Sequence, residues 1–250
     1  NSRVFTSGNQ KNSLDVFVNF NHQSNKVINS GGNDIINTVN LIRAGLPAFS
    51  FYTGVSEGAN FNNKGEYTGA KESAPQVLGK PFPTYNLQLV NNLRIQSLFN
   101  YSKGAKVYNI SNRNVASQGN NFKASEDLKT LLATQTPGTA EYIATANELA
   151  QYAGPRGNFI EKADFIRLSN VTVSYDLGTW AKKQTNGLFK SCVLSLTGNN
   201  LWLTTNYGGV EPQIDSQGGS KRNRGISYLS SDWTAVPAPR SYAMSVNIGF

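Results

Sequence analysis

The chain ends in the segment Ser241-Tyr242-Ala243-Met244-Ser245-Val246-Asn247-Ile248-Gly249-Phe250, in which every second residue from Tyr242 onward is apolar. Successive side chains of a β-strand point to opposite faces of a sheet, so this alternation predicts a strand with one apolar face and one small or polar face. The apolar face would pack on a core in a soluble sandwich. In a transmembrane barrel it would contact lipid, and the terminal aromatic residue would suit the membrane boundary.

The same period recurs upstream. Residues 164–178 place Val171, Val173, Tyr175 and Leu177 on one side and Asn170, Thr172, Ser174 and Asp176 on the other. The second side is too polar for a protein core but suits a wet lumen. Further strands are predicted at residues 12–22, 41–54, 82–90, 93–103 and 191–205. The fold class predicted is therefore all-β, an antiparallel transmembrane barrel segment of about seven strands.

The predicted connections alternate in length. Counted back from Phe250, they are residues 206–240 (long), 179–190 (shorter), 104–163 (long), 91–92 (tight), 55–81 (long) and 23–40 (intermediate). Barrels of the outer membrane have short periplasmic turns and longer extracellular loops, so this rhythm favours a barrel. The tight connection is the pair Asn91-Asn92, because Asn tolerates the positive φ that two-residue hairpin turns need.

The longest connection contains two predicted helices. Ser125 is a capping residue followed by acids, and it leads into a helical stretch at residues 125–133. Residues 139–153 carry apolar side chains at helical spacing. We expect two short helices on the extracellular face.

Composition supports a β-rich protein with long polar loops. Apolar residues make up 38% of the chain and charged residues 15%, beside 23 Gly, 11 Tyr and 13 Phe. The formal net charge of +8 comes from dispersed Lys and Arg, and no nucleic-acid-binding motif accompanies the one tight basic cluster at residues 221–224. A cationic surface beside anionic lipopolysaccharide explains the charge without nucleic acid as a partner.

The sequence gives no support for catalysis, a metal or a cofactor. Cys192 and His22 are the only residues of their kinds, so an internal disulfide, a structural zinc site and a histidine-based triad are not expected. Asp215 with Asp232, or Glu211 with Asp215, would be the candidate acid/base or calcium pairs. They lie in a Gly/Ser-rich loop without ligand spacing, and solvated loop carboxylates are the expectation.

A soluble carbohydrate-binding sandwich is the main alternative. In such a module Trp180, Trp202 and Trp233 would be stacking platforms for sugars. The two hypotheses differ in where the apolar stripes point. They face hydrocarbon in a barrel and meet one another in a dry interior in a sandwich.

The sequence resembles the SusC/RagA-type TonB-dependent outer-membrane transporters through a series of motifs in the family's order. These are residues 41–47 (LIRAGLP) with 51–54 (FYTG), 79–85 (GKPFPTY), 105–109 (AKVYN), 164–175 (DFIRLSNVTVSY), 196–202 (LTGNNLW), 207–213 (YGGVEPQ) and 239–242 (PRSY). The series spans nearly the whole chain. Glu211-Pro212 departs from it, since Asp-Pro is usual at that place.

The resemblance implies a bacterial outer-membrane protein that imports bulky glycan or peptide nutrients with energy delivered through TonB. Family members have a barrel of 22 strands, a plug and a TonB-contacting segment. Residues 1–250 would be the C-terminal portion of that barrel, and the plug, the TonB-contacting segment and the other strands would lie outside this chain. An open sheet edge cannot face lipid, so further strands are required. A SusD-like lipoprotein is the expected extracellular partner, and no bond would be made or broken by the barrel.

Two sets of functional residues are predicted. Substrate contacts are expected first in the extracellular loops, at Trp233, Tyr228, Asp232, Arg222 and Arg224. The alternating terminal strand resembles the signal read by the outer-membrane assembly machinery, and its residues are Tyr242, Met244, Val246, Ile248 and Phe250.

Overall fold

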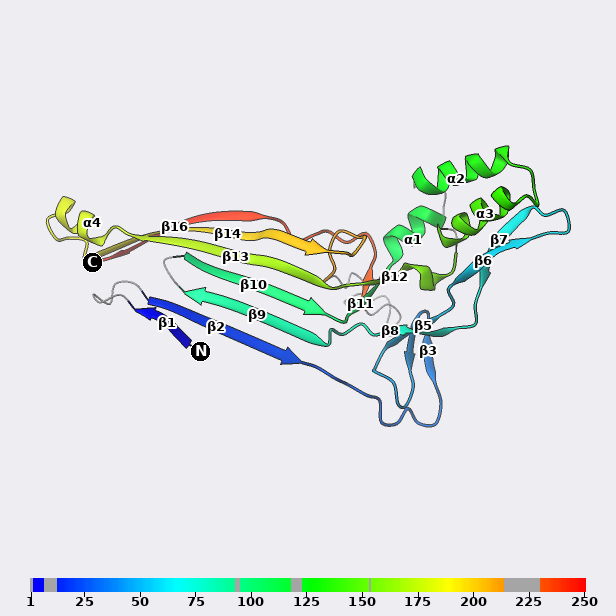
Figure 1. Ribbon diagram of the computed structural model, residues 1–250. Coiled ribbons are helices and arrows are strands. Elements are labelled where there is room, and N and C mark those ends of the chain that lie inside the picture. Colours follow the sequence, from blue (N-terminus) through cyan, green and yellow to red (C-terminus); the bar gives the residue numbers. More distant parts are fainter. Residues whose placement is uncertain (1, 7–12, 93–94, 118–122, 153, 214–229) are drawn as a thin grey trace.

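The computed structural model describes residues 2–6, 13–92, 95–117, 123–152, 154–213 and 230–250. One large sheet extends across one side of the molecule, and smaller sheets and helices gather beyond one of its ends (Figure 1). Helix α4 (Gly178–Gln184) and the C-terminus lie at the opposite end. No helix in the described ranges is long and apolar enough to cross a membrane.

The large sheet consists of seven strands in the described part of the chain, and all neighbouring strands are antiparallel. Their spatial order is β1 (Ser2–Thr6), β2 (Ser13–His22), β9 (Tyr85–Asn92), β10 (Ile95–Lys103), β13 (Phe165–Asp176), β14 (Ser191–Thr205) and β16 (Ser241–Gly249). The predicted all-β antiparallel class is therefore confirmed, and six of the seven predicted strands supply a strand of this sheet.

The prediction of one long strand over residues 41–54 is wrong. The chain turns after Ile42, where the Leu46 amide donates to the Arg43 carbonyl over 3.2 Å and Gly45 takes a φ of +91°. Two short strands result instead of one long strand. They belong to a four-stranded sheet made of β3 (Ile35–Asn37), β4 (Asn40–Ile42), β5 (Ser50–Thr53) and β8 (Gln76–Gly79). The seventh strand of the large sheet is β1, which pairs with β2.

The connections alternate in length more cleanly than predicted. Because β2 pairs directly with β9, the predicted intermediate and long connections merge into one segment, residues 23–84. Asn91 and Asn92 belong to β9 and pair with Ser97 and Gln96, so they are not the turn. All three long connections, residues 23–84, 104–164 and 206–240, leave the same end of the sheet, which we name the loop end (Figure 1). The other end is the turn end.

One face of the large sheet is apolar and exposed. The strand register sets Val173 beside Leu196, and Leu196 beside Met244, across three neighbouring strands. These side chains are 44%, 52% and 71% exposed. The same face carries Val18 and Phe20 on β2, which are equally open. The apolar stripes therefore do not meet one another in a dry interior, and this arrangement contradicts the sandwich alternative.

The opposite face, the polar face, carries a hydrogen-bonded ladder. The hydroxyls of Thr172 and Thr197 lie 2.9 Å apart, as do those of Ser174 and Ser195. One step along the same strands, the Asn170 amide donates to the Asn199 side-chain oxygen over 2.8 Å. Such cross-strand polar pairs stabilise a sheet face that is in contact with water.

The buried hydrophobic core lies under the loops. Its larger cluster contains Val39, Phe51, Tyr108, Ile110, Ala116, Phe159 and Ile160, all from the connections at the loop end. It is enclosed by the four-stranded sheet, by a second small sheet and by helices. The second sheet has the order β12 (Ile160–Lys162), β11 (Lys106–Asn109), β15 (Ser231–Asp232). The core thus fixes the connections at the loop end relative to one another.

Helices in the connection between β10 and β13 form where the sequence predicts two of them. The elements there are α1 (Ile110–Ser117), α2 (Lys123–Thr134), α3 (Ala140–Tyr152) and the 3-10 helix η1 (Arg156–Phe159). Ser125 is buried inside α2 and is not its first residue, so its predicted capping role is wrong. The hairpin β6 (Ser56–Phe61) with β7 (Tyr67–Glu72) packs against α3, and the Tyr142 hydroxyl accepts the Tyr67 amide over 2.8 Å.

Candidate binding pocket at the loop end

A pocket of about 250 Å³ opens on the polar face of the large sheet at the loop end. Its floor comes from three neighbouring strands, because the register sets Asn86 of β9 beside Ser102 of β10 and Ser102 beside Phe165 of β13. All three positions alternate with residues of the apolar face, so their side chains point to the polar face. The full lining is Pro81, Phe82, Pro83, Asn86, Ser102, Ala105, Ala163, Phe165, Pro212, Gln213 and Ser230.

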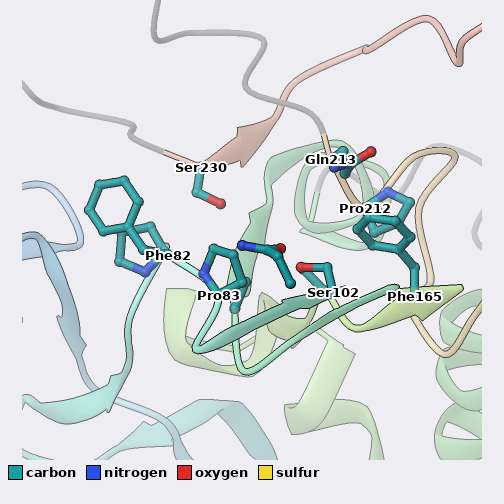
Figure 2. Close-up of a pocket in the computed structure, with 11 residues that line it drawn as sticks. Phe82, Pro83, Ser102, Phe165, Pro212, Gln213 and Ser230 are labelled. Atoms are coloured by element: carbon teal, nitrogen blue, oxygen red, sulfur yellow. The ribbon is translucent and has the colours of Figure 1, made fainter. Parts of the chain in front are cut away.

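The first wall is the segment Pro81-Phe82-Pro83, which precedes β9. Proline has no backbone N–H, so two prolines keep this segment out of the strand ladder. The Phe82 ring packs edge-on against Phe49 with ring centroids 6.4 Å apart. Figure 2 shows Phe82 with Ser230 on one side of the pocket and Pro83 in the middle. Phe82, predicted as part of a strand, is thus a wall residue.

The second wall is Pro212-Gln213, and a buried ion pair holds it in place. Arg167 points from β13 to the polar face and pairs with Glu211, and both residues are less than 10% exposed. The Glu211 carboxylate also accepts the Gln213 amide over 3.2 Å. The Arg167 guanidinium lies 5.5 Å from the centroid of the Phe165 ring, which stands beside Pro212 in Figure 2. Arg167 therefore holds in place both the Phe165 ring and the segment Pro212-Gln213.

A second buried contact positions the strand next to Ser230. The Tyr207 hydroxyl donates to the Asp232 carboxylate over 2.8 Å, and Ser230 donates to the Lys106 carbonyl over 2.8 Å. Burial and the neighbouring Asp232 carboxylate raise the pKa of Tyr207 well above its usual value, so the phenol stays protonated. A side chain at Gly209 would reach the Tyr207 ring and the Asp232 carboxylate within 2.6 Å, so only glycine allows this approach.

Glu161 of β12 connects the loop at residues 207–213 to the small sheet β12-β11-β15. Its carboxylate accepts the Gly208 amide over 2.7 Å and the Asn109 side-chain amide over 2.9 Å. The YGGVEPQ motif at residues 207–213 is therefore held at Tyr207, Gly208 and Glu211 by three separate partners. The motif acts as a rigid support for the pocket.

None of the eleven described residues that line the pocket has an ionisable side chain. Carbon-rich walls from proline and phenylalanine surround four polar side chains, those of Asn86, Ser102, Gln213 and Ser230. No group of three or more His, Cys, Asp or Glu that could hold a metal ion occurs among the described residues. The arrangement can bind an uncharged group by apolar contact with a few hydrogen bonds.

Of the predicted substrate-contact residues, the two that the structure describes, Asp232 and Trp233, are not among the residues that line this pocket. Asp232 is 1% exposed, and its carboxylate accepts hydrogen bonds from Tyr207 and Ser111. Trp233 is 41% exposed on the same loop. Tyr228, Arg222 and Arg224 lie outside the described residues, as does Asp215. The role in substrate contact predicted for Trp233, Tyr228, Asp232, Arg222 and Arg224 stays a prediction.

The lining residues Phe82, Phe165 and Pro212 were not predicted as site residues. The signal was present in the sequence, since all three lie in or beside motifs quoted above, at residues 79–85, 164–175 and 207–213. What the sequence does not show is that these three segments meet.

The predicted assembly residues lie together on one surface. Tyr242, Met244, Val246 and Ile248 are on the apolar face of β16, with exposed fractions from 78% down to 43%. Phe250 follows the strand at the turn end, where its ring packs edge-on against Phe189 with centroids 5.4 Å apart. Their predicted role as an assembly signal remains untested.

The exposed apolar face, the hydrogen-bonded polar face and the loops at one end define the chain as a segment of an antiparallel β-barrel wall. Comparison with solved structures agrees. The chain is similar to the RagAB peptide importer in its closed-closed state, with a TM-score of 0.70 and 17% identity over 99% of this chain and 28% of that chain. It is also similar to the RagAB peptide transporter, with a TM-score of 0.70 and 19% identity over 98% and 28% of the two chains.

The open-open state of the RagAB peptide importer gives a TM-score of 0.67 at 18% identity, covering 99% of this chain and 27% of that one. At this identity the likeness establishes the fold. The chain spans little more than a quarter of the length of the chains it matches. No family model and no curated protein sequence matches.

Proposed function

We propose that this chain forms the C-terminal part of the wall of a TonB-dependent outer-membrane importer for glycan or peptide nutrients. The observation that carries the proposal is the contrast between the two faces of one sheet layer. Val173, Leu196 and Met244 form an open apolar surface on one side, and a ladder of hydroxyl and amide pairs runs along the other. A barrel wall between hydrocarbon and a wet lumen needs this division.

The positions of the loops support transport from the extracellular side inward. Three long connections gather at the loop end, and the α4 connection is short and lies at the turn end (Figure 1). In outer-membrane barrels the long loops are extracellular and the short turns periplasmic. The loop end would then be the mouth through which nutrients enter. A SusD-like lipoprotein would close over it, and the basic balance of the chain suits lipopolysaccharide nearby.

The sheet needs further strands. Within the described residues β1 and β16 are its two edges, and each pairs with one neighbour. Unpaired edges cannot face hydrocarbon, because nothing there satisfies the backbone N–H and C=O groups. The other strands and a plug that TonB engages would come from outside this chain. The barrel itself would carry out no bond chemistry, and two of the solved structures that it resembles are of a peptide importer.

The test is localisation combined with uptake in the source bacterium. We expect the polypeptide to fractionate with the outer membrane. Disrupting its gene should abolish uptake of fluorescently labelled oligopeptides or oligosaccharides, and a protonophore should abolish the same uptake in the parent strain, because TonB transmits energy from the inner membrane. A polypeptide recovered in the soluble fraction, or uptake of both nutrient pools that is unchanged by the disruption, would contradict the proposal.

A further inference from the structure

We propose that the pocket at the loop end binds an uncharged apolar or aromatic side chain of a peptide that passes through the lumen. This inference rests on the proposed function, and it names the part of the substrate that this chain selects. It predicts that the importer prefers peptides with residues such as Leu or Phe over peptides that carry Glu or Lys at the same place.

The volume of the pocket fits one side chain. Pockets for whole drug-sized ligands measure roughly 300–1,000 Å³, and this one is about 250 Å³. Phe82 and Phe165 stand on opposite sides of it, with Pro83 and Ser102 between them (Figure 2). An apolar group of the size of Leu or Phe would contact carbon atoms on both sides. The rest of the ligand would remain in the lumen.

The electrostatics of the lining exclude charged groups. No lining residue in the described part of the chain is ionisable. The two charged residues that hold the second wall of the pocket, Arg167 and Glu211, are buried and paired with each other. A carboxylate or an ammonium group that entered would lose hydration without gaining a counter-charge from these described residues, and that transfer is strongly unfavourable. The pocket therefore selects against Glu and Lys as well as for apolar side chains.

The number of polar groups favours a peptide over a sugar. A sugar ring presents several hydroxyls, and each needs a partner when it leaves water. The pocket offers the side chains of Asn86, Ser102 and Gln213, whereas the Ser230 hydroxyl can only accept because it already donates to the Lys106 carbonyl. An extended peptide residue requires one donor and one acceptor for its backbone. A side-chain amide such as that of Asn86 or Gln213 supplies both.

The walls are fixed before a ligand arrives. The Arg167–Glu211 pair holds Pro212 and Gln213, and the Tyr207–Asp232 contact holds the strand beside Ser230. A pocket whose walls are already ordered spends less of its binding free energy on ordering side chains. The discrimination should therefore appear in equilibrium binding and not only in transport rates.

The experiment measures the affinity of the complete transporter polypeptide, purified in detergent, for pentapeptides of the form Gly-Gly-Xaa-Gly-Gly. Xaa is Leu, Phe, Glu or Lys, and the terminal charges are the same throughout. We expect the Leu and Phe peptides to bind at least about tenfold more tightly than the Glu and Lys peptides, because burial of one apolar side chain supports a factor of this order.

Substitutions locate the effect in the pocket. Ser102→Trp fills the cavity and should remove the discrimination among the four peptides. Ser97→Trp is the matched control, since Ser97 lies on the same strand but pairs with Val171 on the apolar face. It should keep the discrimination. Phe82→Ala removes one wall and adds no bulk, so it tests the pocket even if Ser102→Trp folds poorly. It should reduce the preference for the Phe peptide several-fold. Heat-modifiable gel mobility reports folding of each variant.

Equal affinity for all four peptides, or a preference unaffected by both Ser102→Trp and Phe82→Ala in folded protein, would overturn the inference. Neutral maltohexaose is tested as a competitor of the peptides. If it competes with them and Ser102→Trp abolishes this competition, the pocket binds sugars and the inference is overturned. In each case, uptake that still depends on the intact gene would leave the proposed importer standing. Loss of outer-membrane localisation would instead refute the proposed function.

Discussion

Glu211 illustrates how much a single side chain contributes to the shape of the loop end. It joins Arg167 of the large sheet to the backbone of Gln213 in the loop, and it does so in a buried setting. Removing one partner from a buried ion pair leaves the other charge without compensation, which costs more than the pair itself contributes.

We predict that Glu211→Gln destabilises the loop at residues 207–213 by about 3–5 kcal/mol, the range for breaking a buried pair. Amide hydrogen exchange in this loop should accelerate accordingly, while exchange in β14 stays slow. The double variant Arg167→Met with Glu211→Leu should recover most of the protection, since no buried charge is left. Exchange rates in Glu211→Gln equal to those of the parent would show that the pair does not hold the loop.

At the scale of elements, the long strands are defined by the difference between their two faces. On β14, Leu196 lies on the apolar face beside Val173 and Met244, and its neighbour Ser195 lies on the polar face, hydrogen-bonded to Ser174. Adjacent residues of one strand thus belong to two different environments. The helix α3 has helical spacing instead: it buries Tyr142, Leu149 and several small residues, and it packs against the hairpin β6–β7 and α2.

Leu196→Arg should therefore destabilise the complete barrel by about 2–4 kcal/mol, the cost of a basic residue near the middle of the bilayer. Ser195→Arg places the same charge on the wet face and should cost less than half as much. Urea unfolding in lipid vesicles, followed by tryptophan fluorescence, measures both. Equal destabilisation by the two substitutions would argue against lipid on the apolar face.

At the scale of the whole molecule, a rigid sheet carries a loop assembly with its own hydrophobic core. The core residues Val39, Phe51 and Tyr108 come from connections and not from the long strands. The sheet is stabilised by its ladder and by its surroundings, whereas the loops are stabilised by packing among themselves. Because the loops have their own core, the loop end keeps a defined pocket although both faces of the large sheet are exposed.

Removal of Phe250 is predicted to lower the amount of the protein in the outer membrane several-fold. Phe250 ends the exposed apolar strand β16 at the turn end and contacts Phe189, and a terminal aromatic resembles the signal for barrel assembly. Quantitative immunoblotting of outer-membrane fractions measures the effect, with Tyr242→Phe as a control that preserves an aromatic residue on the strand. Unchanged levels after deletion would remove Phe250 from the assembly signal.

The sequence by itself determined the properties that depend on local periodicity. Alternation along a strand assigns each side chain to a face whatever the strand pairs with, so Val173 and Thr172 could be placed on opposite faces from the sequence. The helix at residues 139–153 was predicted from the helical spacing of its apolar residues, and the helix at residues 125–133 from a capping signal at Ser125 that the structure contradicts. The spacing of the strands also indicated that long and short connections alternate.

Only the tertiary structure decided which segments meet. Residues 41–54 alternate too weakly to reveal the turn at Gly45, and the pairing of β1 with β2 gives no local signal. The pocket depends on contacts between residues far apart in the chain, such as Arg167 with Glu211. Face assignment is a local property of the extended backbone, whereas a pocket built from three connections exists only once packing and ion pairs bring those connections together.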